Sequence, residues 1–266
     1  MEEFGPLQYQ HGLAWREIGQ GTPLVLLHGG SGSRTHWIRN MPALAQRFRV
    51  VTVDLPGFGE SAAPAAGMGV ADYVDWFADA LAARLDGRPF HMAAFSFGAA
   101  LGCAALARRP FDLRRLSLLG PAGYGRPTGR ELGLRKMPGR NAGDEAVRQV
   151  AAENLGRLML ATPPGPDDAV VDLQLRNLAR TRYDSRAVSL GETILDDLQS
   201  VDADVQVIWG EQDRLPSPSL AEREAGTAAA IPGARLRRIA GAGHWVQYEA
   251  SDAVNRVLTT FHAGED

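Results

Sequence analysis

Short runs of consecutive apolar residues recur along the chain, and longer stretches with helical spacing separate them. Such runs, bounded by Gly, Pro or Asp, are typical of strands buried on both faces of a sheet. They cover residues 23–27, 50–53, 90–95, 113–119 and 205–209, and a further strand is predicted at 234–239. Helices are predicted around 37–46, at 70–85, after Ser96 and at the C-terminal end. This alternation predicts an α/β fold with a mostly parallel central sheet and helices on both faces.

Two parts of the chain depart from this alternation. Near the start, residues 7–10 and 13–18 alternate apolar and polar positions around His11-Gly12, which predicts an antiparallel hairpin. Farther on, about seventy residues carry helix-like patterns, Gly and Pro breaks and many arginines, and we expect them to form an inserted helical cap. The predicted units are 1–121 (first part of the core), 122–198 (helical cap) and 199–266 (second part of the core).

Composition narrows the class of protein and its partners. A net charge of −3 gives no basic surface of the kind that binds nucleic acid or an anionic membrane. The single cysteine, Cys103, can form neither an intrachain disulfide nor a thiolate metal site. The acidic N-terminus lacks an apolar signal sequence, and no apolar stretch has the length of a membrane span. We therefore expect a soluble cytoplasmic protein that acts on a small molecule, and the sequence leaves a homodimer open.

The segment Ala94-Phe95-Ser96-Phe97-Gly98 joins a predicted strand to an Ala-rich stretch with helical potential. A serine at such a sharp turn projects from the carboxyl edge of the sheet, and the residues two before and two after it must be small. The usual pattern is G-x-S-x-G; Ala94 replaces the first glycine and still meets the steric demand. Taken alone, the pattern also fits a serine that caps the following helix.

Two further polar residues, Asp213 and His244, each lie just beyond a predicted strand. Open α/β sheets bind ligands at the carboxyl ends of their strands, so these side chains are expected near Ser96. A serine hydroxyl needs a base to take its proton, and a carboxylate holds that base in the right tautomer. Separately, Asp213 could cap a helix near Pro218 and His244 could be a loop histidine. Their joint occurrence in the order Ser, Asp, His favours a catalytic triad.

With these residues in place, the chain resembles the α/β-hydrolase superfamily over nearly its full length. The matching segments are His28-Gly29-Gly30, Asp54–Ser61, the turn at Ser96, Trp209–Asp213 and Gly243-His244-Trp245. The resemblance implies that the backbone N–H groups of Gly30 and Phe97 form an oxyanion hole. It also implies that His28 shapes the loop after its strand and takes no part in the chemistry. No metal or organic cofactor is implied.

Within this superfamily, the segment Gly243–Glu249 and the length of the cap are similar to hydrolases of meta-cleavage products, which split a C–C bond. Those enzymes typically have asparagines where this chain has Phe95 and His36. A cap arginine binds the carboxylate of their substrate, and Arg180 is the candidate here, beside Arg176 and Arg182. For these arginines a solvated helix face is the plainer interpretation.

The two replaced asparagines predict a pocket more apolar than a dienoate substrate needs, with substrate contacts from Phe95 and Trp245 and from His36 as a polar pocket group. A surface position for His36 is the alternative. We expect a serine hydrolase that cleaves a carboxylic ester of a small, largely apolar substrate through an acyl-enzyme. The alternatives are a C–C bond hydrolase with the same triad and a non-catalytic ligand-binding member of the fold. The triad also leaves lactone cleavage open.

Overall fold

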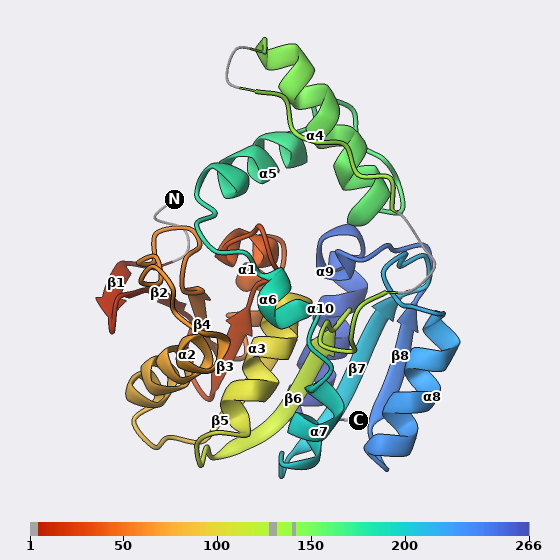
Figure 1. Ribbon diagram of the computed structural model, residues 1–266. Helices are drawn as coiled ribbons and strands as arrows, with labels where there is room; N and C mark the ends of the chain where they lie inside the picture. Colours follow the sequence, from red (N-terminus) through yellow and green to blue (C-terminus); the bar gives the residue numbers. More distant parts are fainter. Residues whose placement is uncertain (1–4, 128–131, 140–141, 266) are drawn as a thin grey trace.

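An eight-stranded sheet forms the centre of the computed structural model, which describes residues 5–127, 132–139 and 142–265 (Figure 1). The strands are β1 (Leu7–Gln10), β2 (Leu13–Ile18), β3 (Pro23–Leu27), β4 (Arg49–Asp54), β5 (Phe90–Phe95), β6 (Leu113–Leu119), β7 (Asp204–Gly210) and β8 (Arg235–Ile239). Their order is β1-β2-β4-β3-β5-β6-β7-β8. The pairs β1/β2 and β2/β4 are antiparallel, and the other neighbours are parallel. The predicted hairpin and the mostly parallel sheet are both confirmed.

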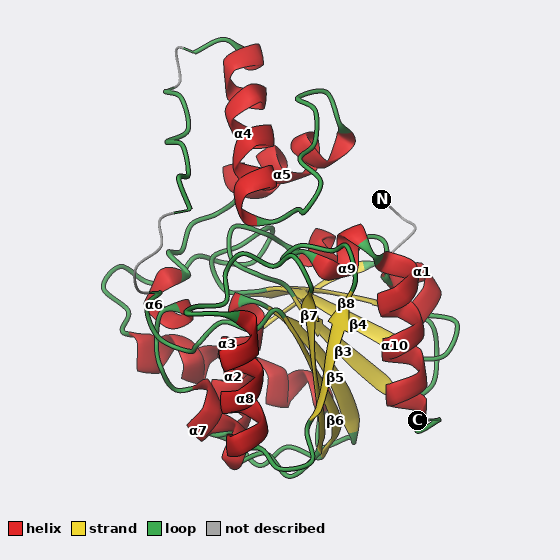
Figure 2. Cartoon of the chain, turned by 90° about the vertical axis from the view of Figure 1, so that its right-hand side faces the viewer, coloured by secondary structure: helices red, strands yellow, loops and turns green. Residues whose placement is uncertain are grey.

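Helices cover both faces of this sheet. They are α1 (Met41–Leu44), α2 (Val70–Leu85), α3 (Phe97–Leu106), α4 (Asp144–Leu158), α5 (Ala169–Ala179), α6 (Arg186–Ser189), α7 (Ile194–Gln199), α8 (Leu220–Ala230), α9 (Val246–Glu249) and α10 (Ser251–Ala263), with a 3-10 turn at Arg34–Trp37. Figure 2 shows α1 and α10 on one face and α2, α3 and α8 on the other. Within the described part of the chain, these helices include none with both the length and the apolar character that a bilayer span requires.

Strand β3 shows why the sheet is covered twice. All five of its residues are buried, and successive side chains of a strand point to opposite faces. Leu24 and Leu26 therefore join an apolar cluster with Leu258 of α10, whereas Val25 and Leu27 join a second cluster with Phe77 of α2. The continuous apolar run in the sequence thus corresponds to two separate cores, one on each side of the sheet.

The segment expected to form a cap contains two kinds of helix. Helices α4 and α5 stand out above one edge of the sheet, and α4 packs against α5 (Figures 1 and 2). Helices α6 and α7 instead pack against α3 of the core. Leu155 of α4 and Val171 of α5 belong to the same apolar cluster as Trp245, which ties the projecting pair to the core. The exact limits, 122 and 198, stay a prediction.

His91 of β5 and His262 of α10 form a buried pair of histidines outside the projecting helices. The rings of His91 and His262 are 5.1 Å apart, and His262 Nε2 lies 2.8 Å from the hydroxyl of Ser117. Burial, followed by the nearby positive charges of Arg115 and Arg114, lowers the pKa of His91 to about 4. Burial and the proximity of His91 and Arg115 also hold the pKa of His262 well below its ordinary value. Both rings are therefore neutral in the folded protein at pH 7.

This pair makes the fold sensitive to acid. Below pH 6.5 the unfolded chain binds protons that the folded protein rejects, so stability is lost as the pH falls from 6.5 towards 4. We expect His91→Phe to reduce the slope of unfolding free energy against pH by up to about 1.4 kcal/mol per pH unit. Urea unfolding between pH 7 and pH 4.5 measures this slope. His11→Asn, at an exposed turn, is the control, and equal slopes for His91→Phe and wild type would contradict the prediction.

Helix α3 packs so closely on the end of β3 that one of its positions accepts only glycine. A Cβ on Gly98 would lie 2.4 Å from the backbone oxygen of His28, whereas a Cβ on Gly226 of α8 would meet nothing within 4 Å. We expect Gly98→Ala to destabilise the fold by about 1–3 kcal/mol, because backbone cannot move aside as a side chain can. The matched variant Gly226→Ala should gain up to about 1 kcal/mol from helix propensity. Chemical denaturation of both variants compares the two sites, and a Gly98→Ala as stable as Gly226→Ala would refute the close packing.

Candidate active site

Three side chains from separate strand ends form a continuous hydrogen-bonded chain. His244 Nε2 lies 2.9 Å from Ser96 Oγ, and His244 Nδ1 lies 2.9 Å from Asp213 Oδ2. The imidazole and the carboxylate are almost completely buried. Because a carboxylate only accepts, Nδ1–H donates to Asp213, and Nε2 is left to accept the serine hydroxyl proton. The residues predicted as a triad therefore meet in one place.

The loops after β7 and β8 bring the aspartate and the histidine together. The N–H of Gln212 donates to the carbonyl of Ala242 at 2.9 Å, and a Cβ on Gly210 would lie 2.0 Å from the oxygen of Gly243. The backbones of the two loops are therefore in direct contact. Asp213 is fixed further because its Oδ1 accepts the N–H of Leu215 at 2.9 Å. This pairing orients the carboxylate towards the imidazole.

The backbone of Ser96 is in a strained conformation. Its φ of +52° and ψ of −116° lie in a region that residues with a side chain rarely adopt. This turn places Ser96 between β5 and the first residue of α3, as the small-x-Ser-x-Gly pattern predicts. The N–H of Phe97, at the start of α3, has no hydrogen-bond partner among the described residues. It is therefore free to face a developing negative charge near the serine.

The loop after β3 supplies a second donor. The N–H of Gly29 donates to His36 Nδ1 at 3.2 Å, which leaves the next N–H, that of Gly30, without a partner in the described chain. Gly30, Ser96 and Phe97 all line one cavity. The two backbone groups predicted to form an oxyanion hole thus face the same space as the serine.

This cavity has a volume of about 420 Å³, which is within the range of small-molecule sites. It is lined mainly by apolar side chains from the core and from the projecting helices: Phe95, Phe97, Pro121, Tyr124, Pro127, Leu132, Leu134, Leu158, Met159, Leu190, Trp209, Leu215 and Pro216. Polar side chains line it as well, among them Ser185, Arg186, Ser189, Arg223 and Gln174 of α5, whose amide N–H donates to the carbonyl of Ser31 at 3.3 Å. Helices α4 and α5 therefore close the site over the sheet edge.

The structure corrects three of the four predicted substrate contacts. Phe95 lines the cavity, but His36, Trp245 and Arg180 do not. His36 and Trp245 are buried behind the lining, with their rings 4.7 Å apart, and Trp245 Nε1 donates to the carbonyl of His36 at 2.9 Å. The side chain of Arg180 is 57% exposed and forms an ion pair with Glu60 at 3.2 Å, so its solvated interpretation holds.

Polar residues beside the site have structural roles. His28 Nε2 accepts the N–H of Leu55 at 2.9 Å and its Nδ1 donates to the carbonyl of Gly29, which joins the loops after β3 and β4. Burial lowers the pKa of His28 to about 4. Asp54 accepts the backbone N–H groups of Arg34 and Glu60 at 2.8 and 3.0 Å. Among the described residues, no group of three or more His, Cys, Asp or Glu is placed to hold a metal ion.

Two residues near the triad were not predicted from the sequence. A Cβ on Gly120, whose φ is +46°, would lie 2.9 Å from His244 Nδ1, so the imidazole packs directly on bare backbone. Glu249 accepts the N–H of Gly243 at 2.7 Å and those of Ala161 and Thr162 at 3.0 Å. Gly120 follows a buried strand directly, a signal that could have placed it at the site. Glu249 carries no such signal, because its partners are backbone groups and two of the three, those of Ala161 and Thr162, are distant in sequence.

The chain is similar to several known proteins. The chain is 34% identical, over 94% of its length and 66% of the relative's, to the dihydrolipoyllysine-residue acetyltransferase component of an acetoin cleaving system from Pseudomonas putida. It is also 28% identical, over 94% of its length and 92% of the relative's, to a 2-hydroxy-6-oxo-2,4-heptadienoate hydrolase from P. putida. A carboxylesterase from Bacillus subtilis has the same fold, with a TM-score of 0.71, 21% identity and coverage of 95% and 88% of the two chains.

The sequence profile of one family accounts for most of the chain. Residues 22–251 match the family described as having the alpha/beta hydrolase fold, a span that includes every strand from β3 to β8 and all three members of the hydrogen-bonded chain. The parallel sheet, the turn at Ser96 and the order Ser, Asp, His agree with this match. The protein is therefore a member of the alpha/beta hydrolase fold family.

Proposed function

We propose that this protein cleaves a carboxylic ester of a small, largely apolar substrate through a Ser-His-Asp triad. The observation that carries the proposal is the pair of 2.9 Å hydrogen bonds that link Ser96, His244 and Asp213 at the wall of an apolar cavity. A hydroxyl paired with an imidazole, itself oriented by a carboxylate, is the arrangement that activates serine as a nucleophile.

The reaction has two halves. Ser96 Oγ attacks the ester carbonyl while His244 Nε2 takes its proton, and the N–H groups of Gly30 and Phe97 stabilise the oxyanion that forms. The imidazolium, held by Asp213, then gives this proton to the departing alkoxide, which leaves as the alcohol. In the second half, water gives a proton to His244 and attacks the acyl-enzyme carbonyl. Collapse of that intermediate returns the proton to Ser96 and releases the carboxylic acid.

The character of the cavity supports an apolar substrate. Phe95 lies beside the serine with its ring 4.9 Å from that of His244, and it occupies a position where the C–C hydrolases that this chain resembles typically have asparagine. The wall formed by Leu158 and Met159 is apolar as well. Such a site binds hydrocarbon well, and most of its wall offers no partner to the polar oxygens of a dienoate. The two arginines of the lining, Arg186 and Arg223, are engaged with Asp184 and with the carbonyl of Tyr124.

C–C bond hydrolysis is the second candidate, and the relative named as a 2-hydroxy-6-oxo-2,4-heptadienoate hydrolase favours it. The same serine, histidine and oxyanion donors would serve that reaction, so the triad alone does not separate the two. A ligand-binding protein without turnover is the third candidate. Of the three, the ester hydrolase has the best fit to the apolar lining.

Removal of the nucleophile tests the triad. We expect Ser96→Ala to lower kcat for p-nitrophenyl butyrate by at least about a thousandfold, because no other group takes over the attack. The control is Ser189→Ala, which removes a different serine hydroxyl from the wall of the same cavity and should stay within about threefold of wild type. The initial rates of wild type and both variants are measured by p-nitrophenolate absorbance. Activity that survives in Ser96→Ala would exclude Ser96 as the nucleophile.

A direct comparison of substrates separates the candidate reactions. We expect kcat/KM for p-nitrophenyl butyrate to exceed that for a 6-alkyl-2-hydroxy-6-oxohexa-2,4-dienoate by at least about tenfold, because most of the cavity wall is apolar and its two arginines already pair with other groups of the protein. Loss of the dienoate chromophore measures the second rate. The opposite ranking would favour the C–C hydrolase. Absence of turnover with both compounds, in a protein whose ordered fold is verified by circular dichroism, would favour the ligand-binding role.

A further inference from the structure

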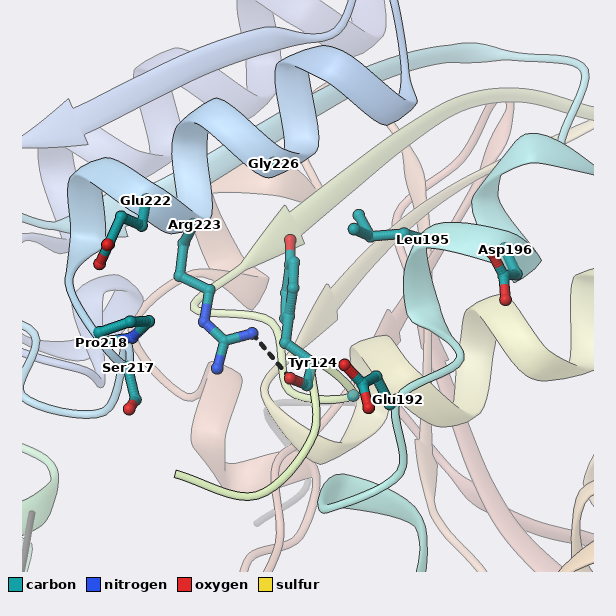
Figure 3. A pocket seen from close by; sticks show the side chains of 10 residues that line it. Tyr124, Glu192, Leu195, Asp196, Ser217, Pro218, Glu222, Arg223 and Gly226 are labelled. Atoms are coloured by element: carbon teal, nitrogen blue, oxygen red, sulfur yellow. Dashed lines mark hydrogen bonds between the residues drawn. The ribbon is translucent and has the colours of Figure 1, made fainter. Parts of the chain in front are cut away.

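A second cavity, of about 570 Å³, lies beside the active-site cavity. Figure 3 shows side chains that line it. Leu195 of α7, Pro218 and the start of α8 supply part of its lining. Three carboxylates also line it, those of Glu192, Asp196 and Glu222. The space is therefore larger and more polar than the cavity that holds Ser96.

The two cavities share one wall. Gly123, Tyr124 and Arg223 line both of them, so these three residues separate the active site from the second space. In Figure 3, the side chain of Arg223 extends from α8 towards the backbone of Tyr124, and Glu192 lies on the other side of that tyrosine. The depth of the active-site cavity on this side is consequently set at these three residues.

Most of this wall is held firmly. The N–H of Gly123 donates to the carbonyl of Ser189 at 3.0 Å, and its carbonyl accepts the N–H of Ile194 at 3.2 Å. The hydroxyl of Tyr124 lies 2.9 Å from Thr227 Oγ1, which fixes the far end of the ring. The backbone of the wall and the tyrosine ring are thus anchored to the cap segment and to α8.

The side chain of Arg223 is the part with the weakest anchoring. Its Nη1 donates to the carbonyl of Tyr124 at 3.1 Å, and its guanidinium carbon lies 4.3 Å from the centre of the Tyr124 ring. It forms no ion pair with any residue in the described chain. A long side chain held by one hydrogen bond to a neutral group and by one ring face rotates away at low cost.

We propose that Arg223 is a specificity-determining residue that ends the active-site cavity, and that the second cavity is the continuation of that site for longer substrates. This inference rests on the proposed ester hydrolysis. With the guanidinium in place, the cavity limits the chain length of the substrate. When the side chain is shortened or rotates away, the far end of a longer chain enters the second space along Leu195 and Pro218. The carboxylates there disfavour an anionic end group, so the longer substrates are neutral esters.

Chain-length preference tests the wall. The measured quantity is the ratio of kcat/KM for p-nitrophenyl dodecanoate to that for p-nitrophenyl acetate, in wild type, Arg223→Ala and Arg223→Met. Methionine keeps most of the length of the side chain and removes its charge, whereas alanine removes both. We expect the ratio to rise at least about tenfold in Arg223→Ala and to stay within about threefold of wild type in Arg223→Met. Arg238→Ala, which removes an arginine outside both cavities, is the control and should not change it.

Any of the following results would overturn the inference. An unchanged ratio in a folded Arg223→Ala would show that the residue does not limit the chain. Equal changes in Arg223→Ala and Arg223→Met would show that charge acts in place of length. A wild-type enzyme that already prefers the dodecanoate would show that the wall does not limit the chain. If Arg223→Ala does not fold, Arg223→Ser, which also removes nearly the whole length of the side chain and leaves a small polar group, replaces it with the same expected direction. Failure of wild type to hydrolyse the acetate ester would instead refute the proposed function.

Discussion

The left-handed backbone of Ser96 is the constraint on which the site depends. A φ of +52° at a residue with a side chain costs on the order of 1–3 kcal/mol, and the surrounding packing has to hold it there. It does so because Gly98 allows α3 to rest on the backbone of His28, at the end of β3. The same contact brings the loop after β3 beside the serine, so one close approach positions both the hydroxyl and the N–H of Gly30.

The sequence predicted correctly those features whose pattern has one main physical cause. Continuous apolar runs belong to strands buried in the sheet, and each of the five predicted in this way is a strand of the structure. The convergence of Ser96, Asp213 and His244 could also be predicted, because parallel strands present their carboxyl ends at a common edge. In both cases the local sequence and the topology point to the same answer.

The side chains that contact substrate could not be predicted in the same way. Position along the chain does not tell whether a side chain near the site faces the cavity or the core. His36 turns inward because Gly32 has no Cβ, and a methyl group there would overlap the imidazole. Arg223 belongs to no sequence motif. Its place in the wall between the two cavities arises from the packing of α8 against the loop after β6. Such positions depend on contacts between distant segments, which local patterns do not encode.

Glu249 has a consequence for how the projecting helices could move. Its carboxylate joins the loop of His244 to residues 161–162, and the N–H of Trp245 donates to the carbonyl of Met159 at 2.7 Å. Beyond the end of α5, the N–H of Arg182 donates to the carbonyl of Gly57 at 2.7 Å. Helix α5 is therefore fastened to the core on both sides, by the connection from α4 before it and by Arg182 after it. Lifting the connection between α4 and α5 would pull on the loop that carries His244, so an open form of this protein would also lose the hydrogen bond between the imidazole and Ser96.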